Sequence, residues 1–196
     1  MKKPYPLTLT GNSVDLVPLS AEHLGELCEV GLDESIWKWI PYAVRSVDEM
    51  RDYIAAALRA QADGSAIPFA ILERNSGKAI GSTRYMSIDV PNNRLEIGAT
   101  WIGTKWQRTR VNTEMKYLML RHAFEELGCT RVELKTDALN EKSRNAILRI
   151  GAKEEGTLRK HVVTYSGRIR DTVYYSILDT EWPQVRSDLG MKLSGA

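Results

Sequence analysis

The pattern of apolar and polar residues between Trp101 and Gly128 predicts the end of a strand, a short loop and a long helix. In the second half of this segment the apolar residues recur at the spacing of one helix face, and a second apolar stripe beside it indicates a well-buried helix. The first stripe consists of Met115, Leu118, Met119, His122, Ala123 and Leu127. Asn112 or Thr113 is placed to cap the start of this helix, and Gly128 to end it.

The remaining elements follow from the same pattern and from turn and capping residues. Strands are predicted over residues 7–19 (interrupted at Gly11-Asn12), 67–72, 79–87, 94–102, 131–137, 156–165 and 169–178. Helices are predicted over residues 20–30, 46–63, 140–151 and 180–189, with an irregular aromatic segment at 31–45 and a loose tail at 190–196. This order predicts an α+β fold with one mixed, mostly antiparallel sheet of about seven strands, flanked by about four main helices.

Length and composition agree with one domain spanning residues 1–196, with its core between residues 7 and 182. The chain has 196 residues, of which 43% are hydrophobic and 27% charged, which is enough for a hydrophobic core. A net charge of +2 argues against a nucleic-acid-binding surface. Cys28 and Cys129 lack the spacing of a metal or redox site, so no metal is expected. The sequence shows neither a signal peptide nor a membrane-spanning run, which predicts a cytoplasmic protein that binds no membrane.

The loop before the long helix has the features of an anion site. A helix N-terminus offers unpaired N–H groups and the positive end of the helix dipole. Lys105, Arg108 and Arg110 lie in the approach to it. This combination suits a small phosphate-bearing ligand. A solvated basic loop explains the same residues about equally well, because basic helix entries only sometimes bind phosphate.

Several phrases of the sequence resemble a known family. They are Glu-Ile-Gly-Ala-Thr-Trp-Ile-Gly at 96–103, Trp-Gln-x-x-x-x-Asn-Thr-Glu at 106–114, Lys-Thr-Asp-x-x-Asn-x-x-Ser-Arg at 135–144 and Arg-Asp-Thr-Val-Tyr-Tyr-Ser at 170–176. Together with the order of elements, these phrases resemble the GNAT N-acetyltransferases. Within that superfamily the chain is similar to the Rim-type branch, which includes enzymes that acetylate the N-termini of ribosomal proteins.

This resemblance implies transfer of an acetyl group from acetyl-CoA to a primary amine, which is either a protein N-terminal α-amine or a small-molecule amine. Backbone N–H groups of the loop and helix start would hold the pyrophosphate, aided by an arginine. The strand end would splay from its neighbour and offer backbone groups to the pantetheine arm and the thioester oxyanion. The residues implied in cofactor binding are Trp101, Ile102, Gly103, Gln107, Arg108, Thr109, Arg110, Val111, Asn112, Thr113, Asn140 and Ser143.

The loop departs from the family pattern at two positions. Gln107 fits that pattern, but Arg110 stands where glycine is usual and Asn112 where a small residue is usual. Glycine permits unusual φ angles and close approach of a ligand to the backbone. Arg110 must therefore either accept strain or replace a backbone contact by a guanidinium contact, for which phosphate is a good partner.

The family resemblance also implies where the protons go. Many members carry a tyrosine seven residues after Asn140, but here that residue is Ile147, which has no proton to give. Ser143 would protonate the leaving thiolate, and its alternative role is that of a small residue near a helix start. Glu96 is the candidate base, acting through water, and its alternative role is an ion pair with Arg84 or Arg94.

An α-amine is the easier acceptor to deprotonate. With a pKa near 7.8 it costs about 1 kcal/mol to deprotonate at pH 7, against about 4–5 kcal/mol for a lysine near 10.4. The residues expected to select the acceptor are Trp37, Trp39, Tyr42, Arg84 and Tyr85, and the two tryptophans are equally suited to packing. The sequence fits a monomer or a homodimer. A second hypothesis is a non-catalytic acyl-CoA-binding or regulatory module on the same scaffold, favoured by Ile147 and Arg110.

Overall fold

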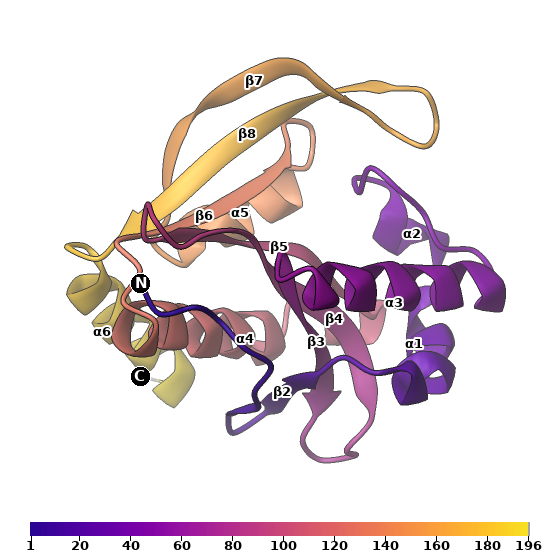
Figure 1. Cartoon of the computed structure of the whole chain (residues 1–196), viewed down its shortest axis with the longest axis horizontal. Helices are drawn as coiled ribbons and strands as arrows, with labels where there is room; N and C mark the ends of the chain where they lie inside the picture. The colour runs from indigo at the N-terminus through magenta and orange to yellow at the C-terminus, as the bar shows by residue number, and fades with distance from the viewer. Residues whose placement is uncertain (196) are drawn as a thin grey trace.

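The computed structural model describes residues 1–195 and contains one mixed sheet covered by helices on both faces (Figure 1). The strands are β1 (Leu9–Thr10), β2 (Val14–Pro18), β3 (Ala66–Glu73), β4 (Ala79–Asp89), β5 (Arg94–Ile102), β6 (Arg131–Asp137), β7 (Lys153–Val163) and β8 (Ile169–Leu178). The helices are α1 (Leu24–Gly31), α2 (Glu34–Trp37), α3 (Val47–Ala62), α4 (Arg110–Arg121), α5 (Glu141–Arg149) and α6 (Trp182–Ser194). The predicted α+β class and mixed sheet are confirmed.

The strand order within the described residues is β1-β2-β3-β4-β5-β6-β8-β7. All neighbouring pairs are antiparallel except β5 and β6, which are parallel and joined through α4. The sheet has eight strands because the predicted first strand divides into two at a turn, where the amide of Gly11 donates to the carbonyl of Val14. The parallel crossover places the start of α4 beside the carboxyl end of β5, which is where the candidate site lies.

Alternation along the central strands separates two hydrophobic cores. On β3, Phe69 and Ile71 face the core beneath α4 and α6, whereas Ala70 faces the core beneath α1 and α3. Each strand residue therefore belongs to one of two distinct surroundings. In Figure 1, α4 and α6 lie side by side at one end of the molecule, and α1, α2 and α3 lie at the other.

Two predicted details are wrong. The long helix begins at Arg110 with Thr109 as its cap, not with Asn112 or Thr113, because the Thr109 hydroxyl accepts the amide of Val111. Nor is the segment 190–195 a loose tail, because α6 continues to Ser194. Its last turn is held from outside the helix. The Arg110 guanidinium donates to the carbonyl of Leu193, and the Lys192 ammonium donates to a carbonyl at the end of α5. Residue 196 lies outside the described residues.

Candidate active site

The parallel strands β5 and β6 separate after a short paired stretch. Their register runs from Arg94–Arg131 to Glu96–Glu133 and ends there. On its other edge β5 carries a bulge against β4, where Ser82 pairs with Trp101 but Arg84 pairs with Gly98. Ala99, inside this bulge, has a φ of 48°. The resemblance implied a splay at 101–103. The strands already part beyond Glu96, so the unpaired edge of β5 is longer than expected.

A cavity of about 920 Å³ occupies the gap between the two strands. It is walled by the ends of β5 and β6, the start of α4, the first two turns of α5 and the segment 35–42. Eleven of the sequence-predicted site residues line it, namely Trp39, Tyr42, Glu96, Trp101, Ile102, Gln107, Arg108, Thr109, Asn112, Asn140 and Ser143. The fold therefore brings the predicted cofactor loop, the candidate base and the candidate acid to one hollow.

Three of the predicted acceptor residues lie away from the cavity. The Trp37 side chain is fully buried and donates from its indole to the carbonyl of Gly31 at 2.7 Å, which is the packing role considered for it. Tyr85 faces the core beneath α4 and donates to the carbonyl of Met119 at 2.7 Å. Arg84 lies over the ring of Tyr53, with 4.8 Å between guanidinium carbon and ring centroid. None of the three lines the cavity.

Four of the predicted cofactor residues also do not line the cavity. The amide of Gly103 donates to the carbonyl of Ile80 at 2.9 Å. Val111 is buried in the core, and the hydroxyl of Thr113 accepts a bond from Arg149 at 2.9 Å. The Arg110 guanidinium turns toward α6. The side chains of Arg110, Val111 and Thr113 and the amide of Gly103 therefore serve the fold.

The start of α4 presents free backbone donors. Within residues 1–195 the amides of Arg108 and Thr109 have no protein acceptor. The amides of Arg110 and Asn112 lie in the first helical turn, where no intrahelical acceptor exists. Arg108 itself has a φ of 61°, a left-handed conformation that residues other than glycine rarely adopt. The backbone strain expected at Arg110 is therefore located at Arg108, and Arg110 is an ordinary helical residue.

Two further cations beside this loop were missed in the sequence. Lys142 and Arg149 on α5 line the cavity, seven residues apart and so on one helix stripe. The Gln107 side chain joins the elements, since its amide nitrogen donates to the carbonyl of Ile102 at 2.9 Å and its oxygen accepts from Lys142. The spacing of the two cations was the available signal. With Arg108, they place three positive charges around the free amides.

Helix α5 supplies the opposite wall. Asn140 caps it, as predicted, because its side-chain oxygen accepts the amide of Ser143 at 3.1 Å. Ser143 is half-buried and lies on the cavity wall one turn before Ile147, which is buried there. Asn140 both caps α5 and lines the cavity, so its role in the fold leaves it accessible to a ligand.

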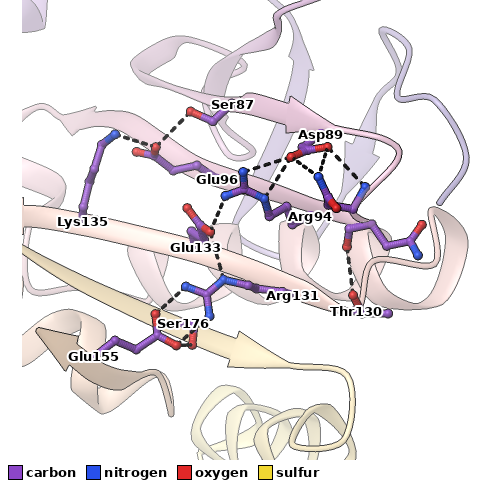
Figure 2. A network of polar contacts seen from close by, with 12 residues as sticks. Ser87, Asp89, Arg94, Glu96, Thr130, Arg131, Glu133, Lys135, Glu155 and Ser176 are labelled. Carbon is purple, nitrogen blue, oxygen red and sulfur yellow. Dashed lines mark hydrogen bonds and ion pairs between the residues drawn. The ribbon is translucent and has the colours of Figure 1, made fainter.

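Glu96 is buried on the face of the sheet opposite α4, with 2% of its surface exposed. Neither Arg84 nor Arg94 is its partner. Lys135 on β6 pairs with it at 2.8 Å, and Ser87 donates to the same oxygen at 3.3 Å (Figure 2). Burial lowers the pKa of Lys135, but the hydrogen bond and charge of Glu96 outweigh it and raise that pKa. The carboxylate thus lies in the cavity wall as half of an ion pair.

Lys116 on α4 is a buried cavity residue that the sequence did not indicate. Only 6% of its surface is exposed, and its ammonium nitrogen donates to the hydroxyl of Thr100 in the β5 bulge at 3.0 Å. Within residues 1–195 it has no ion-pair partner. Burial lowers its pKa to about 7, against a smaller opposing effect of the Glu96 charge. Its position inside the apolar stretch of the helix was the signal available in the sequence.

The tip of the β7–β8 hairpin reaches toward α2 in Figure 1. The amide of Tyr165 at this tip donates to the carbonyl of Pro41 at 2.8 Å. Arg168 of the hairpin lies over the Trp39 ring, 5.5 Å from its centroid. Pro41 and Trp39 both line the cavity. The hairpin tip is therefore tied to one wall of the cavity by what we call the hairpin bridge, residues 164–168 against 39–41.

Comparison with known proteins decides the family. The protein-family model described as "Acetyltransferase (GNAT) domain" matches residues 14–153. The chain belongs to the GNAT acetyltransferases. This acetyltransferase is 34% identical over 170 residues to the Bacillus subtilis protein named "Putative ribosomal N-acetyltransferase YdaF", covering 85% of this chain and 90% of that one. The name of this relative supports the Rim-type branch.

Solved structures agree on the fold of the acetyltransferase. A GCN5-related N-acetyltransferase from Brucella melitensis superposes with a TM-score of 0.87 at 31% identity, over 96% of this chain and 86% of that one. The structure titled "Mycobacterium smegmatis RimJ in complex with CoA-disulfide" superposes with a TM-score of 0.84 at 20% identity, over 100% of this chain and 98% of that one, which bears on the fold alone.

Residues 1–195 lack two kinds of feature. No helix in that range is long and apolar enough to cross a membrane. Nor does that range contain a group of three or more side chains that could hold a metal ion.

Proposed function

We propose that this acetyltransferase moves an acetyl group from acetyl-CoA to the α-amine of a protein N-terminus, with both substrates bound at once. One observation carries the proposal. A single cavity connects the free amides at the start of α4 with a buried carboxylate, Glu96, through the gap between β5 and β6. A ligand bound from the α4 side and an acceptor entering beneath the hairpin bridge would meet at the β5 bulge.

The α4 end of the cavity fits the pyrophosphate of acetyl-CoA. Within residues 1–195, four backbone amides between Arg108 and Asn112 have no hydrogen-bond acceptor, and a helix N-terminus attracts negative charge. Arg108, Lys142 and Arg149 add positive side chains. Asn140 and the unpaired edge of β5 would hold the pantetheine arm, and a backbone N–H of that edge would stabilise the thioester oxygen as charge develops on it.

The acceptor end fits a positively charged amine that must lose its proton. Glu96 would draw the incoming ammonium and remove its proton through water, and Ser143 would supply a proton to the departing sulfur. Trp39 and Tyr42 would contact the residue that carries the amine. An α-amine is favoured because it is neutral at pH 7 far more often than a lysine side chain. The name of the Bacillus subtilis relative, a ribosomal N-acetyltransferase, points to the same substrate class.

The test is release of free thiol from acetyl-CoA with two matched peptides. One carries a free α-amine and no lysine; the other is blocked at its N-terminus and carries one lysine. We expect at least a hundredfold higher kcat/KM for the first peptide. Glu96→Gln should reduce it, whereas Asp52→Asn, an exposed charge on α3, should not. Tight CoA binding without turnover on any amine would instead support a non-catalytic CoA-binding module.

A further inference from the structure

The mechanism proposed above leaves one proton without an acceptor. An amine that arrives as an ammonium loses two protons before it becomes an amide. The first is removed before attack, and the second leaves the nitrogen as the C–N bond forms. One proton goes to solvent, and the other belongs on the sulfur of the released thiol. Glu96 accounts for the first step, but its carboxylate is held by Lys135 and Ser87.

We propose that Lys116 is a second proton-transfer group of the site, which takes a proton from the attacking nitrogen and returns it to the departing sulfur. The proposal rests on the acetyl transfer proposed above. It adds a reacting residue from the face of the sheet opposite Glu96.

The position of Lys116 supports this role. Thr109, Asn112 and Lys116 all line the cavity, and their spacing of three and four residues puts them on one face of α4. A helix rises 1.5 Å per residue, so Lys116 lies roughly 9 Å deeper than the first helical residue. The same helix face thus runs from the proposed phosphate end to the bulge of β5, where Lys116 reaches Thr100. The thioester would lie at this deeper end.

The surroundings of Lys116 favour an uncharged amine. Thr100 accepts its hydrogen bond and is itself bonded to the hydroxyl of Thr83 at 2.8 Å, so the direct partner of the Lys116 nitrogen is an uncharged hydroxyl. A buried ammonium without an ion pair is costly, and burial accordingly lowers the pKa of Lys116 to about 7. A neutral amine that donates one hydrogen to Thr100 keeps its lone pair for a proton from the cavity.

Charged groups lie around Lys116 on several elements. Glu96 on β5 raises its pKa slightly, while Lys135 on β6, Arg149 on α5 and Arg170 on β8 line the same cavity as cations. Two nearby carboxylates have other partners. Glu114 accepts the amides of residues 12–14. Glu125 contacts Trp182 and Arg186 on α6. Burial therefore outweighs the one acidic group, Glu96, that acts on Lys116.

The proton steps balance. The amine nitrogen attacks the acetyl carbon and the C–N bond forms. The extra proton on the amine nitrogen passes to the Lys116 nitrogen. The C–S bond breaks, and the resulting ammonium gives the proton to the sulfur, directly or through the hydroxyl of Ser143. A thiol with a pKa of about 8.5 holds a proton more tightly than an amine that titrates near 7, so this return is favourable. Lys116 ends neutral and ready for another cycle.

The first test is titration of the lysine side chains by NMR in the protein without ligands. Lys116, assigned through its loss in Lys116→Met, should titrate near pH 7, and Lys78→Met, a change at an exposed lysine, should leave this titration in place. A Lys116 that titrates near 10 would overturn the proposal whatever the enzyme turns over.

The second test is the pH dependence of kcat. The wild type should gain activity as pH rises through about 7, following the deprotonation of Lys116. Lys116→Arg keeps a donor for Thr100 but stays protonated, and Lys116→Met fills the space without a donor. Both should lose this rise and about a hundredfold or more in kcat, with CoA affinity within about threefold of the wild type. Lys78→Met is the matched control and should behave as the wild type.

The outcomes separate the two proposals. If Lys116→Arg keeps the wild-type kcat and pH profile, Lys116 only positions the bulge and the proton-transfer role is wrong, while the proposed function stands. If the wild type acetylates no amine, the proposed function is wrong and the role of Lys116 falls with it.

Discussion

The left-handed backbone of Arg108 allows stability and cofactor binding to be varied separately. Its φ of 61° costs an ordinary residue about 1–2 kcal/mol, and glycine adopts it freely. Arg108→Gly and Arg108→Ala both remove the guanidinium, but only glycine relieves the strain. Glycine also loses roughly 0.5–1 kcal/mol through the larger freedom of its unfolded chain. Arg108→Gly should therefore be about 0.5–1 kcal/mol more stable than Arg108→Ala.

The binding effect should be common to both variants. An exposed guanidinium beside a phosphate contributes on the order of 1–1.5 kcal/mol, so CoA affinity should fall roughly tenfold in each. Thermal unfolding without ligand gives the stability, with glycine higher by about 2–3 °C for a chain of this size. Calorimetry at low and high salt gives the affinity. Equal thermal stability of the two variants, or CoA affinity unchanged in both, would refute the reasoning.

The remaining predictions concern stability and reactivity. Glu114 accepts three amides of the turn between β1 and β2, so Glu114→Ala should lower the free energy of unfolding by about 3 kcal/mol in urea titrations, while Glu22→Ala, exposed and unbonded, should change it by less than about 0.5 kcal/mol. The Arg131 guanidinium lowers the pKa of Glu155 from 4.5 to about 2. The folded state gains its full stabilisation from this pair above pH 4.5 and loses it as the pH falls through 2. Between these pH values the free energy of unfolding of Glu155→Gln should therefore fall less steeply than that of the wild type. Burial raises the pKa of the Cys129 thiol to about 11, and iodoacetamide at pH 8 should label it only in denaturant; rapid labelling of the folded protein would contradict its burial.

Alternation along the strands predicted much of the fold and part of the site. The period of two on β5 places Glu96 opposite Leu95 and Ile97, and the structure puts the carboxylate in the cavity and the two aliphatic side chains in the core. Asn140 has a sequence signature as a helix cap, and it is one. Strand alternation and helix capping depend on residues close together in the chain, so both could be predicted from the sequence.

Features that depend on distant partners were not accessible. Tyr85 and Trp37 are amphipathic residues, which suit either a core or a binding site. Which face of the strand or helix is buried depends on distant elements, and here both residues lie in the core. The Arg110 guanidinium is held by the end of α6, more than eighty positions further along, so its partner was not accessible from the sequence. Lys116 escaped notice because a hydrophobic pattern assigns every lysine to solvent, whereas this one is buried.

The tie between Tyr165 and Pro41 has a consequence for what can be acetylated. The contact joins the hairpin to the segment 39–41 in the cavity wall, so an acceptor that enters on this side would have to pass the hairpin bridge. A flexible chain end has one flanking segment to place there, whereas a lysine within a folded surface has two. Entry on this side would therefore favour chain ends, whatever residue carries the amine.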